Sequence, residues 1–544
     1  MNNQMQPIFI LPEGTTRNTG KSAQRANIAA ARAAAETVRT TLGPKGMDKM
    51  LVDSMGDVVI TNDGVTILDE MEIEHPAAKM MLEIAKVQEN EIGDGTTTAV
   101  ILGGELLKNA EELLEKNIHP AVIANGYKLA AEKAQEILPK LSKSVTIEDK
   151  SVLTNIAITA MTGKNVEMAR EKLAQIAVDA ILRIAEQKDG GIIIDTDNIK
   201  LVKKEGAGVT ASQSVQGIVL DKERVHSGMP RSIKDAKIAL LECAIEARET
   251  ETDAKIQLTD PRQLQAFLEH EERALKDMVG KVIASGANVV FCQKGIDDMA
   301  QHYLAKKGIY ALRRIKDSDI AALAKATDAK VVANINDLTS DDLGYAGLVE
   351  ERKLHKEDMT FVENCKNPRA VSIILRGGTK HVVTEVERAM TDAIGDISAA
   401  ITVGKYVAGG GAIEIELARR LRAYSEQLSG RVQLAVQAFA ESLEIIPITL
   451  AENAGLDPIN VITNLKVKHD NGEIHAGIDI ETGGSRDMVE VGIIEPLKIK
   501  TQAIQSATEA AIMLLRIDDI IAAHKINKGT GSPQMSPGMP GMGM

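Results

Sequence analysis

The residues best suited to chemistry lie in a glycine-rich stretch, Gly93-Asp-Gly-Thr-Thr-Thr98, which runs directly into a helical pattern at 99–116. Glycine lets the backbone approach an anion closely, and the first free amides of a helix point toward that anion. The helix dipole and three hydroxyl groups add further attraction for phosphate. Asp94 alone would repel phosphate, but it suits a magnesium ion that bridges phosphate oxygens. The alternative is an ordinary threonine cap, which needs only one glycine, so the stretch favours phosphate binding.

Two other glycine turns could approach the same ligand. Thr41-Leu-Gly-Pro-Lys-Gly46 follows a helical pattern, and by itself it is an ordinary helix stop, since glycine and then proline often end helices. Ala408-Gly-Gly-Gly-Ala412 precedes another helical pattern. Three successive glycines cost backbone entropy on folding, which a close ligand or close helix packing must offset.

Two carboxylates are candidates for hydrolytic chemistry. Asp63 is expected in a turn between Asn62 and Gly64, and Asp392 lies in a helical stretch at 386–394. Phosphoryl transfer to water needs a carboxylate that orients the attacking water, in addition to the metal ligand. Residue type alone does not choose among the 77 acidic residues, because most such side chains are solvated surface.

One apparent nucleotide motif fails on its spacing. Gly14-Thr-Thr-Arg-Asn-Thr-Gly-Lys-Ser22 resembles a Walker A loop, with residues 8–11 as the preceding strand. A Walker A loop has four residues between its glycines, whereas this stretch has five. The extra residue would disrupt the nest of amides around the phosphates. The sequence also lacks HExxH, GxSxG and a Cys/His cluster at metal-ligand spacing.

The elements that must position these residues change in type along the chain. Helical spacing of apolar residues dominates the first 140 positions, interrupted at 51–64 by two short β-prone runs. The centre then follows the order strand, helix, strand, helix, strand, which is typical of a compact α/β domain with parallel pairing. These five elements are expected at 288–292, 297–307, 309–315, 317–327 and 330–333.

Helices flank that centre on both sides. One at 260–284 has an apolar stripe and a charged face, and the pattern alone favours a helix packed on its own core. Helical patterns return at 413–428, 432–452 and 501–519, before a Gly/Pro/Ser/Met tail at 529–544 that we expect to be disordered. Helical ends around an α/β centre predict a nested layout, in which the two chain ends fold together.

The composition excludes several classes of protein. With 544 residues, 44% hydrophobic and 26% charged, the chain is expected to form roughly two to four globular domains. A net charge of -13 argues against a nucleic-acid ligand, and 2% aromatic residues argue against base stacking. No stretch approaches the roughly 20 apolar residues of a membrane span, and the polar N-terminus lacks a secretory signal. We therefore expect a cytoplasmic protein with reduced thiols and with no nucleic-acid or membrane partner.

Taken together, the motifs resemble the nucleotide motifs of chaperonins in order and spacing, over essentially the whole chain. They are Thr41-Leu-Gly-Pro-Lys-Gly-Met-Asp-Lys-Met50, Thr61-Asn-Asp-Gly64, Gly93-Asp-Gly-Thr-Thr-Thr98 and Ala408-Gly-Gly-Gly411. Three further segments and a charged insertion at about 246–276 resemble archaeal group II chaperonins more than the bacterial type. Those segments are Asp48-Lys-Met-Leu-Val52, Glu74-His-Pro-Ala-Ala-Lys79 and Lys500-Thr-Gln-Ala-Ile504.

The resemblance implies a ring-forming chaperone that hydrolyses ATP, with ATP and Mg²⁺ as cofactors. Asp94 would hold the magnesium ion, Asp392 would position the attacking water, and Asp63 would be the second hydrolytic carboxylate. Lys164 matches a lysine that senses the terminal phosphate. The other residues implied to bind nucleotide are Leu42, Gly43, Pro44, Asn62, Gly95, Thr96, Thr97, Thr98, Gly410 and Glu495, the last two at the adenosine end.

The same resemblance implies a multidomain fold. A mainly α-helical equatorial domain would come from both chain ends, at 1–146 and 404–528, and α/β intermediate segments would lie at 147–216 and 369–403. An α/β apical domain would occupy 217–368 and carry a helical lid protrusion at about 246–276, with Ile256, Leu258 and Phe267 as candidates for client or lid contacts. The partners would be unfolded client proteins and identical or paralogous subunits in a stacked double ring.

Two positions depart from the family pattern. Thr402-Val403 occupies a loop in which relatives carry an acidic pair, and Ile448 stands where a basic residue is usual. Neither belongs to the implied hydrolytic set, so ATP hydrolysis should persist. Two other function classes stay open on the residues alone: a small-molecule kinase or ligase, and a scaffold whose glycine loops are only caps. Phosphate transfer to a metabolite would indicate the first, and no ATP turnover the second.

Overall fold

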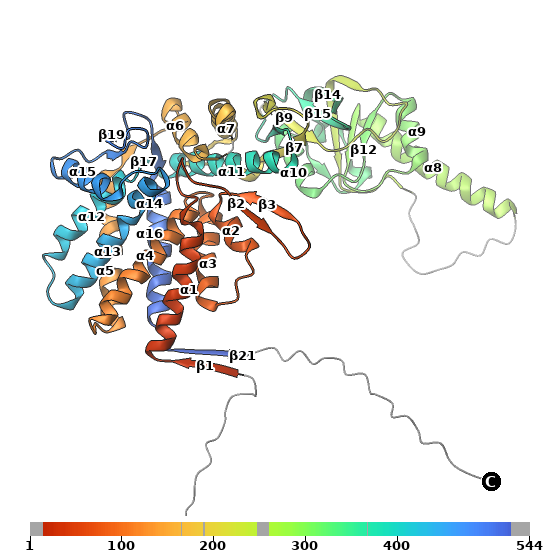
Figure 1. Ribbon diagram of the computed structural model, residues 1–544. Helices are drawn as coiled ribbons and strands as arrows, with labels where there is room; N and C mark the ends of the chain where they lie inside the picture. The colour runs from red at the N-terminus through yellow and green to blue at the C-terminus, as the bar shows by residue number, and fades with distance from the viewer. Residues whose placement is uncertain (1–14, 165, 189–190, 247–260, 367, 524–544) are drawn as a thin grey trace, which may run out of the picture.

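The computed structural model describes residues 15–164, 166–188, 191–246, 261–366 and 368–523. Figure 1 shows three groups of elements: a helical group that contains both described chain ends, a middle group around α11, and a sheet-containing group from which α8 projects. The groups bury their apolar side chains in separate clusters. This is the mixed helical and α/β multidomain fold that the sequence predicts.

Small residues let the helices of the helical group pack closely, both within the first part of the chain and between its beginning and its end. A Cβ at Gly104 would clash with the Cβ of Ala35, and one at Gly126 would clash with the Cβ of Ala435. These close approaches let helices from distant parts of the sequence pack without a gap. The long helices are α1 (Lys21–Arg39), α3 (Pro76–Glu91), α4 (Thr96–Glu115), α5 (Pro120–Leu141), α12 (Ala412–Ser425), α13 (Arg431–Leu443) and α16 (Leu497–Leu515).

One stretch of this group corrects the expectation about membrane-length segments. Arg431–Asn453 is apolar and long enough to cross a membrane by length and composition, so the statement that no stretch approaches that length was wrong. The stretch comprises α13 and α14 (Ile445–Asn453), and 72% of its most apolar window is buried inside the protein. Ala435, Phe439 and Leu443 lie in the core of the helical group, so packing accounts for its apolar character.

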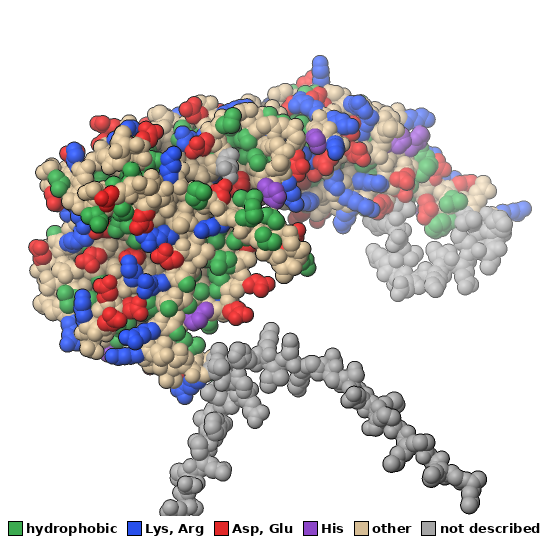
Figure 2. All heavy atoms as spheres, viewed as in Figure 1, with side chains coloured by type: hydrophobic (Ala, Val, Ile, Leu, Met, Phe, Trp, Pro, Cys, Tyr) green, Lys and Arg blue, Asp and Glu red, His purple; other side chains and the backbone are tan. Residues whose placement is uncertain are grey.

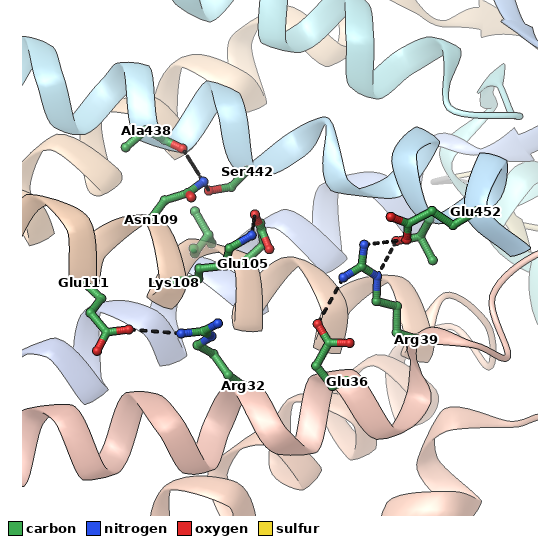
Figure 3. Close-up of polar contacts among 12 residues, drawn as sticks. Arg32, Glu36, Arg39, Glu105, Lys108, Asn109, Glu111, Ala438, Ser442 and Glu452 are labelled. Carbon is green, nitrogen blue, oxygen red and sulfur yellow. Dashed lines mark hydrogen bonds and ion pairs between the residues drawn. The ribbon is translucent and has the colours of Figure 1, made fainter. Parts of the chain in front are cut away.

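Polar contacts also fasten α1 to the last third of the chain (Figure 3). Arg39, at the end of α1, donates to Glu36 at 3.0 Å, to Glu452 at 2.6 Å and to Thr449 at 3.2 Å. In the same group, the Asn109 side chain of α4 donates to the Ser442 hydroxyl of α13 at 2.8 Å. Over the face drawn in Figure 2, acidic and basic side chains are interspersed along the helices.

The middle group is built on three helices and a three-stranded sheet, with the short β5–β6 pair (Glu186–Lys188 and Gly191–Ile193) beside them. Helices α6 (Lys150–Met161), α7 (Arg170–Ile184) and α11 (Lys380–Val403) form one buried cluster with the sheet of β7 (Ile199–Glu205), β16 (Val371–Gly377) and β8 (Gln213–Val215). The Thr402-Val403 pair was expected in a loop, but it forms the last turn of α11. Gly404 then ends the helix in the left-handed region at φ 69°, which glycine adopts readily.

The sheet-containing group confirms the α/β elements predicted for the centre. Strands β11 (Val289–Cys292), β12 (Tyr310–Leu312) and β13 (Val331–Val332) alternate with α9 (Asp298–Lys306) and α10 (Asp317–Thr327). β11 and β13 pair in parallel with β10 (Ser232–Leu241), and β12 pairs in parallel with β11. The antiparallel half of the sheet was not predicted; it comprises β14 (Gly344–Leu354), β15 (Glu357–Glu363) and β9 (Gly217–Leu220).

Helix α8 (Pro261–Ser285) combines the two interpretations of its apolar stripe. Its C-terminal half packs on the sheet, with Leu275 4% and Val279 2% exposed. Its N-terminal half projects from the group (Figure 1), with Phe267 38% and Leu268 55% exposed. Much of the expected protrusion, including Ile256 and Leu258, lies outside the described residues.

The two described ends of the chain pair with each other, and a hairpin follows α1. β1 (Thr15–Thr19) pairs antiparallel with β21 (Asp519–Ala523), so the prediction that the last helix extends to residue 519 was wrong. Residues 15–22 of the Walker-like stretch therefore form β1 and the start of α1, while Gly14 and residues 8–11 lie outside the described part of the chain. The two β-prone runs form β2 (Lys49–Val52) and β3 (Val58–Thr61), which pair as a hairpin.

Candidate functional site

A cavity of about 600 Å³ lies where the helical group meets the middle group. Its lining comes from both ends of the chain and from α6, α7 and α11. The structure brings together on this cavity all fourteen residues that the sequence singled out. They are Leu42, Gly43, Pro44, Asn62, Asp63, Asp94, Gly95, Thr96, Thr97, Thr98, Lys164, Asp392, Gly410 and Glu495.

The Gly93–Thr98 stretch presents a helix N-terminus to the cavity. Helix α4 begins at Thr96, three residues earlier than expected, and Gly95 is its N-cap in the left-handed conformation at φ 82°. A side chain at Gly95 would lie 2.7 Å from Ile499 and 2.9 Å from the Gln88 amide. Gly95 therefore meets two requirements, since it takes a positive φ and leaves room for its neighbours. The first-turn amides of α4 are free to bind an anion.

Three loops meet beside this helix end. Gly43 has φ 83°, and a side chain on Gly163 would lie 2.7 Å from the Gly43 carbonyl oxygen. The Asn62 amide donates to the Gly163 carbonyl at 2.7 Å. Asn62 therefore ties its own loop to the loop that carries Lys164, and Gly163 of that loop packs closely against Gly43 and Pro44. The sequence pattern predicted neither contact.

Asp63 corrects the prediction of a simple turn. It is the N-cap of α2 (Gly64–Glu70), and its Oδ2 accepts from the Thr66 amide at 2.9 Å and from the Thr66 hydroxyl at 2.7 Å. Its Oδ1 accepts from the Thr96 hydroxyl at 3.3 Å. Asp63 thus joins the starts of α2 and α4, and these bonds hold the carboxylate in one orientation at the cavity wall.

Asp392 and Lys164 form an ion pair within the cavity lining. Their side chains are 16% and 13% exposed. Burial raises the pKa of Asp392 to about 7, and Lys164 opposes this rise while Asp94 and Asp63 add to it. Burial lowers the pKa of Lys164, but Asp392 and Asp94 raise it by more, so Lys164 stays charged. The site therefore holds a carboxylate that titrates near neutral pH, next to a permanent cation.

Part of the cavity lining is apolar. This part includes Ile478, Met488 and Ile493. Gly410, at φ 60°, makes room for Met488, because a Cβ on Gly410 would lie 2.8 Å from the Met488 sulfur. Apolar side chains beside a glycine turn suit the flat face of a nucleoside base.

Glu495 lies close to Gly409 in a buried charge cluster. Lys500 pairs with Glu495 at 2.6 Å and with Glu414 at 2.9 Å. Burial raises the pKa of Glu495 and Lys500 opposes that rise. Burial lowers the pKa of Lys500, but Glu414 and Glu495 raise it by more, so Lys500 remains an ammonium group. One cation thus holds two carboxylates in place.

The donor set suits magnesium bound together with phosphate. Among the described residues, no group of three or more His, Cys, Asp or Glu side chains is arranged to hold a metal ion by itself. Asp94 supplies a hard carboxylate oxygen at the cavity, next to the N-terminus of α4. Mg²⁺ is commonly held by one or two carboxylates plus substrate phosphate oxygens, so the residues present fit such an ion.

Sequence reasoning missed several residues of the lining. Lys500 lay in a segment that was noted only for its family resemblance, and Arg170 and Asn155 gave no local signal. The Arg170 guanidinium donates to the Thr162 hydroxyl at 3.2 Å, so it supports the segment before Lys164. These contacts depend on the packing of α6 and α7 against the helical group, which local patterns do not encode.

The chain also matches a known protein family along most of its length. A model of the TCP-1/cpn60 chaperonin family matches residues 34–525. The chain belongs to the TCP-1/cpn60 chaperonin family. This chaperonin is 62% identical over 521 residues to a thermosome subunit of Methanopyrus kandleri, with 96% of each chain covered. It is 60% identical over 537 residues to a thermosome subunit of Pyrococcus horikoshii, with 98% of each covered.

A solved structure supports the same assignment. The open-state monomer of a group II chaperonin from Methanococcoides burtonii is 46% identical and superposes with a TM-score of 0.59, covering 78% of this chain and 100% of that one. The expected family and fold class are confirmed: this is an archaeal-type group II chaperonin, and its function is ATP-dependent chaperoning of proteins.

Proposed function

We propose that this chaperonin hydrolyses ATP in the cavity between its helical and middle groups, within a ring of identical or paralogous subunits. The observation that carries the proposal is the convergence of the fourteen singled-out residues on one cavity. They come from distant segments, and chance would not bring a helix N-terminus, glycine turns and three aspartates to the same surface. A cytoplasmic location is proposed with this function, because ATP is supplied there.

The phosphate end is proposed to bind through backbone amides. The free amides of Thr96, Thr97 and Thr98 at the start of α4, together with the Gly43 turn, are the donors for phosphate oxygens. Mg²⁺ held at Asp94 would neutralise phosphate charge and so ease attack at phosphorus. The apolar end near Gly410 takes the base, with Glu495 fixed beside it by Lys500.

Hydrolysis is proposed to depend on two aspartates. Asp392 positions the attacking water and accepts its proton, a role for which a pKa of about 7 is well matched. Asp63 is the second carboxylate, held in place by Thr66 and Thr96. Lys164 holds Asp392 and offers a cation to the terminal phosphate. Because Lys164 and Asp392 belong to the middle group, phosphate contacts would be transmitted to α11 and its neighbours.

The proposed cycle encloses unfolded client proteins. Residues of the helical and middle groups line one cavity, so bound nucleotide would tie the two groups together. The exposed apolar side chains of α8, Phe267 and Leu268, are proposed to contact clients or neighbouring lids. This is consistent with the group II assignment and gives ATP turnover a mechanical output.

Two measurements on the purified protein test the proposal. Negative-stain microscopy should show stacked rings. A denatured reporter enzyme should regain activity with Mg²⁺ and ATP, and it should not with a non-hydrolysable analogue. Single particles without ring symmetry, or refolding that does not depend on nucleotide, would refute the proposed function.

A further inference from the structure

We infer that Asn453, the last residue of α14, positions the Leu42–Gly43 peptide so that the Gly43 amide faces the bound nucleotide. The inference rests on the proposed ATP site and adds a residue that does not line the cavity. Asn453 therefore acts through the loop and is a positioning residue.

The Asn453 side chain spans the end of α1 and the loop that follows it. Its Nδ2 donates to the Arg39 carbonyl at 3.1 Å and to the Leu42 carbonyl at 2.9 Å. The last carbonyls of a helix lack partners inside the helix, so a bond to Arg39 alone would be an ordinary cap. The bond to Leu42 lies three residues beyond the helix, and it fixes a peptide within the glycine turn.

Peptide geometry turns this bond into an orientation for Gly43. In a trans peptide, the carbonyl and the following N–H point in opposite directions, and the described chain has no cis bond. The Leu42 carbonyl points toward Asn453, which lies outside the lining, so the Gly43 N–H points to the other side of the peptide. Within the described part of the chain the Gly43 amide has no acceptor. Gly43 lines the cavity, so this amide is available to a phosphate oxygen.

Asn453 is itself held rigidly. Arg39 donates to Thr449 at 3.2 Å and to Glu452 at 2.6 Å, which fixes the last turn of α14 against α1, as Figure 3 shows for Glu452. Leu450 of the same turn packs directly against Gly43, where a Cβ would overlap its side chain. The end of α14 is therefore a fixed support on which the 41–46 turn is built.

Asn453→Asp tests this inference with nearly unchanged shape. The carboxylate cannot donate to either carbonyl, so the Leu42–Gly43 peptide loses its restraint. Asn109→Asp is the matched control, because Asn109 makes the same kind of contact in the same helical group, to Ser442 at 2.8 Å and Ala438 at 3.4 Å. Asn109 does not line the cavity. Asn453→Ala is the second variant, should the introduced charge prevent folding.

The first readout needs no nucleotide. The Gly46 amide donates to the Gly43 carbonyl and the Met47 amide to the Thr40 carbonyl, each at 2.9 Å, so both report the order of the turn. Hydrogen exchange at these amides should accelerate on the order of tenfold in Asn453→Asp, as expected for the loss of a part-buried hydrogen bond. It should not change in Asn109→Asp. Equal acceleration in both variants, or none in Asn453→Asp, would overturn the inference.

The second readout separates binding from chemistry. The Kd for ATP should rise on the order of tenfold in Asn453→Asp, while turnover at saturating ATP falls by no more than about threefold, since the hydrolytic carboxylates are untouched. Loss of turnover with unchanged affinity would contradict the positioning role. Failure of the wild-type protein to bind ATP would instead refute the proposed function, and hydrogen exchange would still decide whether Asn453 orders the turn.

Discussion

Lys164 and Asp392 are 228 residues apart in the chain, yet they form an ion pair within the lining of the cavity. Lys164 follows α6, and Asp392 lies on α11, so the pair joins two elements of the middle group directly beside Asp63 and Asp94 of the helical group. The proposed chemistry is therefore shared between two groups of the fold. Substitutions on either side should separate nucleotide binding from hydrolysis.

Asp392→Ala should bind ATP with little change and hydrolyse it on the order of 10²-fold more slowly, because the phosphate and metal contacts remain while the group that orients water is lost. Equilibrium binding and phosphate release measure the two effects. Glu387→Gln, on the same helix and paired with Lys203, is the control and should keep wild-type turnover. Wild-type turnover in Asp392→Ala would remove Asp392 from the catalytic role.

Asp94→Ala should weaken both binding and hydrolysis, because the lost carboxylate is the proposed magnesium ligand. Raising the magnesium concentration should restore part of the ATP affinity by mass action. A titration of ATP binding at low and high magnesium measures this. If affinity at low magnesium equals that of the wild type, Asp94 does not hold the metal.

Glu416 should make stability depend on pH under acidic conditions. This buried α12 carboxylate accepts from His469 of α15 (Pro458–Asp470) at 3.0 Å and from Arg420 at 2.7 Å. Burial alone would raise its pKa, but these hydrogen bonds and a further one from Arg419 lower the pKa by more, so that it is about 2. The folded pKa lies below the ordinary value of 4.5, so the carboxylate stabilises the fold above pH 4.5, and that stabilisation is lost as the pH falls toward 2.

Glu416→Gln tests this dependence. Its Tm should lie below that of the wild type near neutral pH, since removing one partner of a buried pair costs about 3 kcal/mol. The difference in Tm between the two proteins should shrink as the pH falls below 4.5. Glu426→Gln, at an exposed position just after α12, should show no such trend. A Tm difference that stays constant with pH would contradict the linkage.

Deleting residues 256–276 with a short Gly-Ser bridge should leave ring assembly and ATP hydrolysis largely intact. Nucleotide-cavity residues lie in the helical and middle groups, whereas the described part of this segment, 261–276, belongs to α8 of the sheet-containing group. The deletion removes one core residue of that group, Leu275. Containment should fail, so ATP should protect the wild-type sheet-containing group from protease but not that of the deletion. Phe267→Ser with Leu268→Ser, both at exposed positions, should weaken protection without lowering stability. Equal protection in all three proteins would place the lid elsewhere.

Local patterns predicted the elements that depend on neighbouring residues. Helix α10 (Asp317–Thr327) follows its predicted range, and the two β-prone runs predicted within 51–64 form β2 and β3, because apolar spacing and turn residues determine these elements over short distances. Helix α4 begins earlier than predicted, because Gly95 takes the left-handed cap and leaves all three threonines inside the helix. In the antiparallel half of the central sheet, the β10–β14 and β15–β9 pairings were missed because they join strands far apart in sequence. The local β14–β15 hairpin was missed as well.

The family resemblance implied that the site residues lie together. It did not imply the residues that hold them in place. Asn453 contacts Leu42 across 411 residues, and Lys500 pairs with Glu414 from a different helix. Such contacts carry no local signal, because only tertiary packing brings these side chains together. The roles proposed for the cavity residues remain predictions that the experiments above address.

Release of inorganic phosphate from ATP by the purified, assembled protein tests the central claim most directly. The account predicts steady phosphate release that requires magnesium and falls on the order of 10²-fold in Asp392→Ala, while that variant still binds ATP. Absence of release from wild-type rings with magnesium present, or release that Asp392→Ala leaves unchanged, would contradict the claim that this cavity hydrolyses ATP.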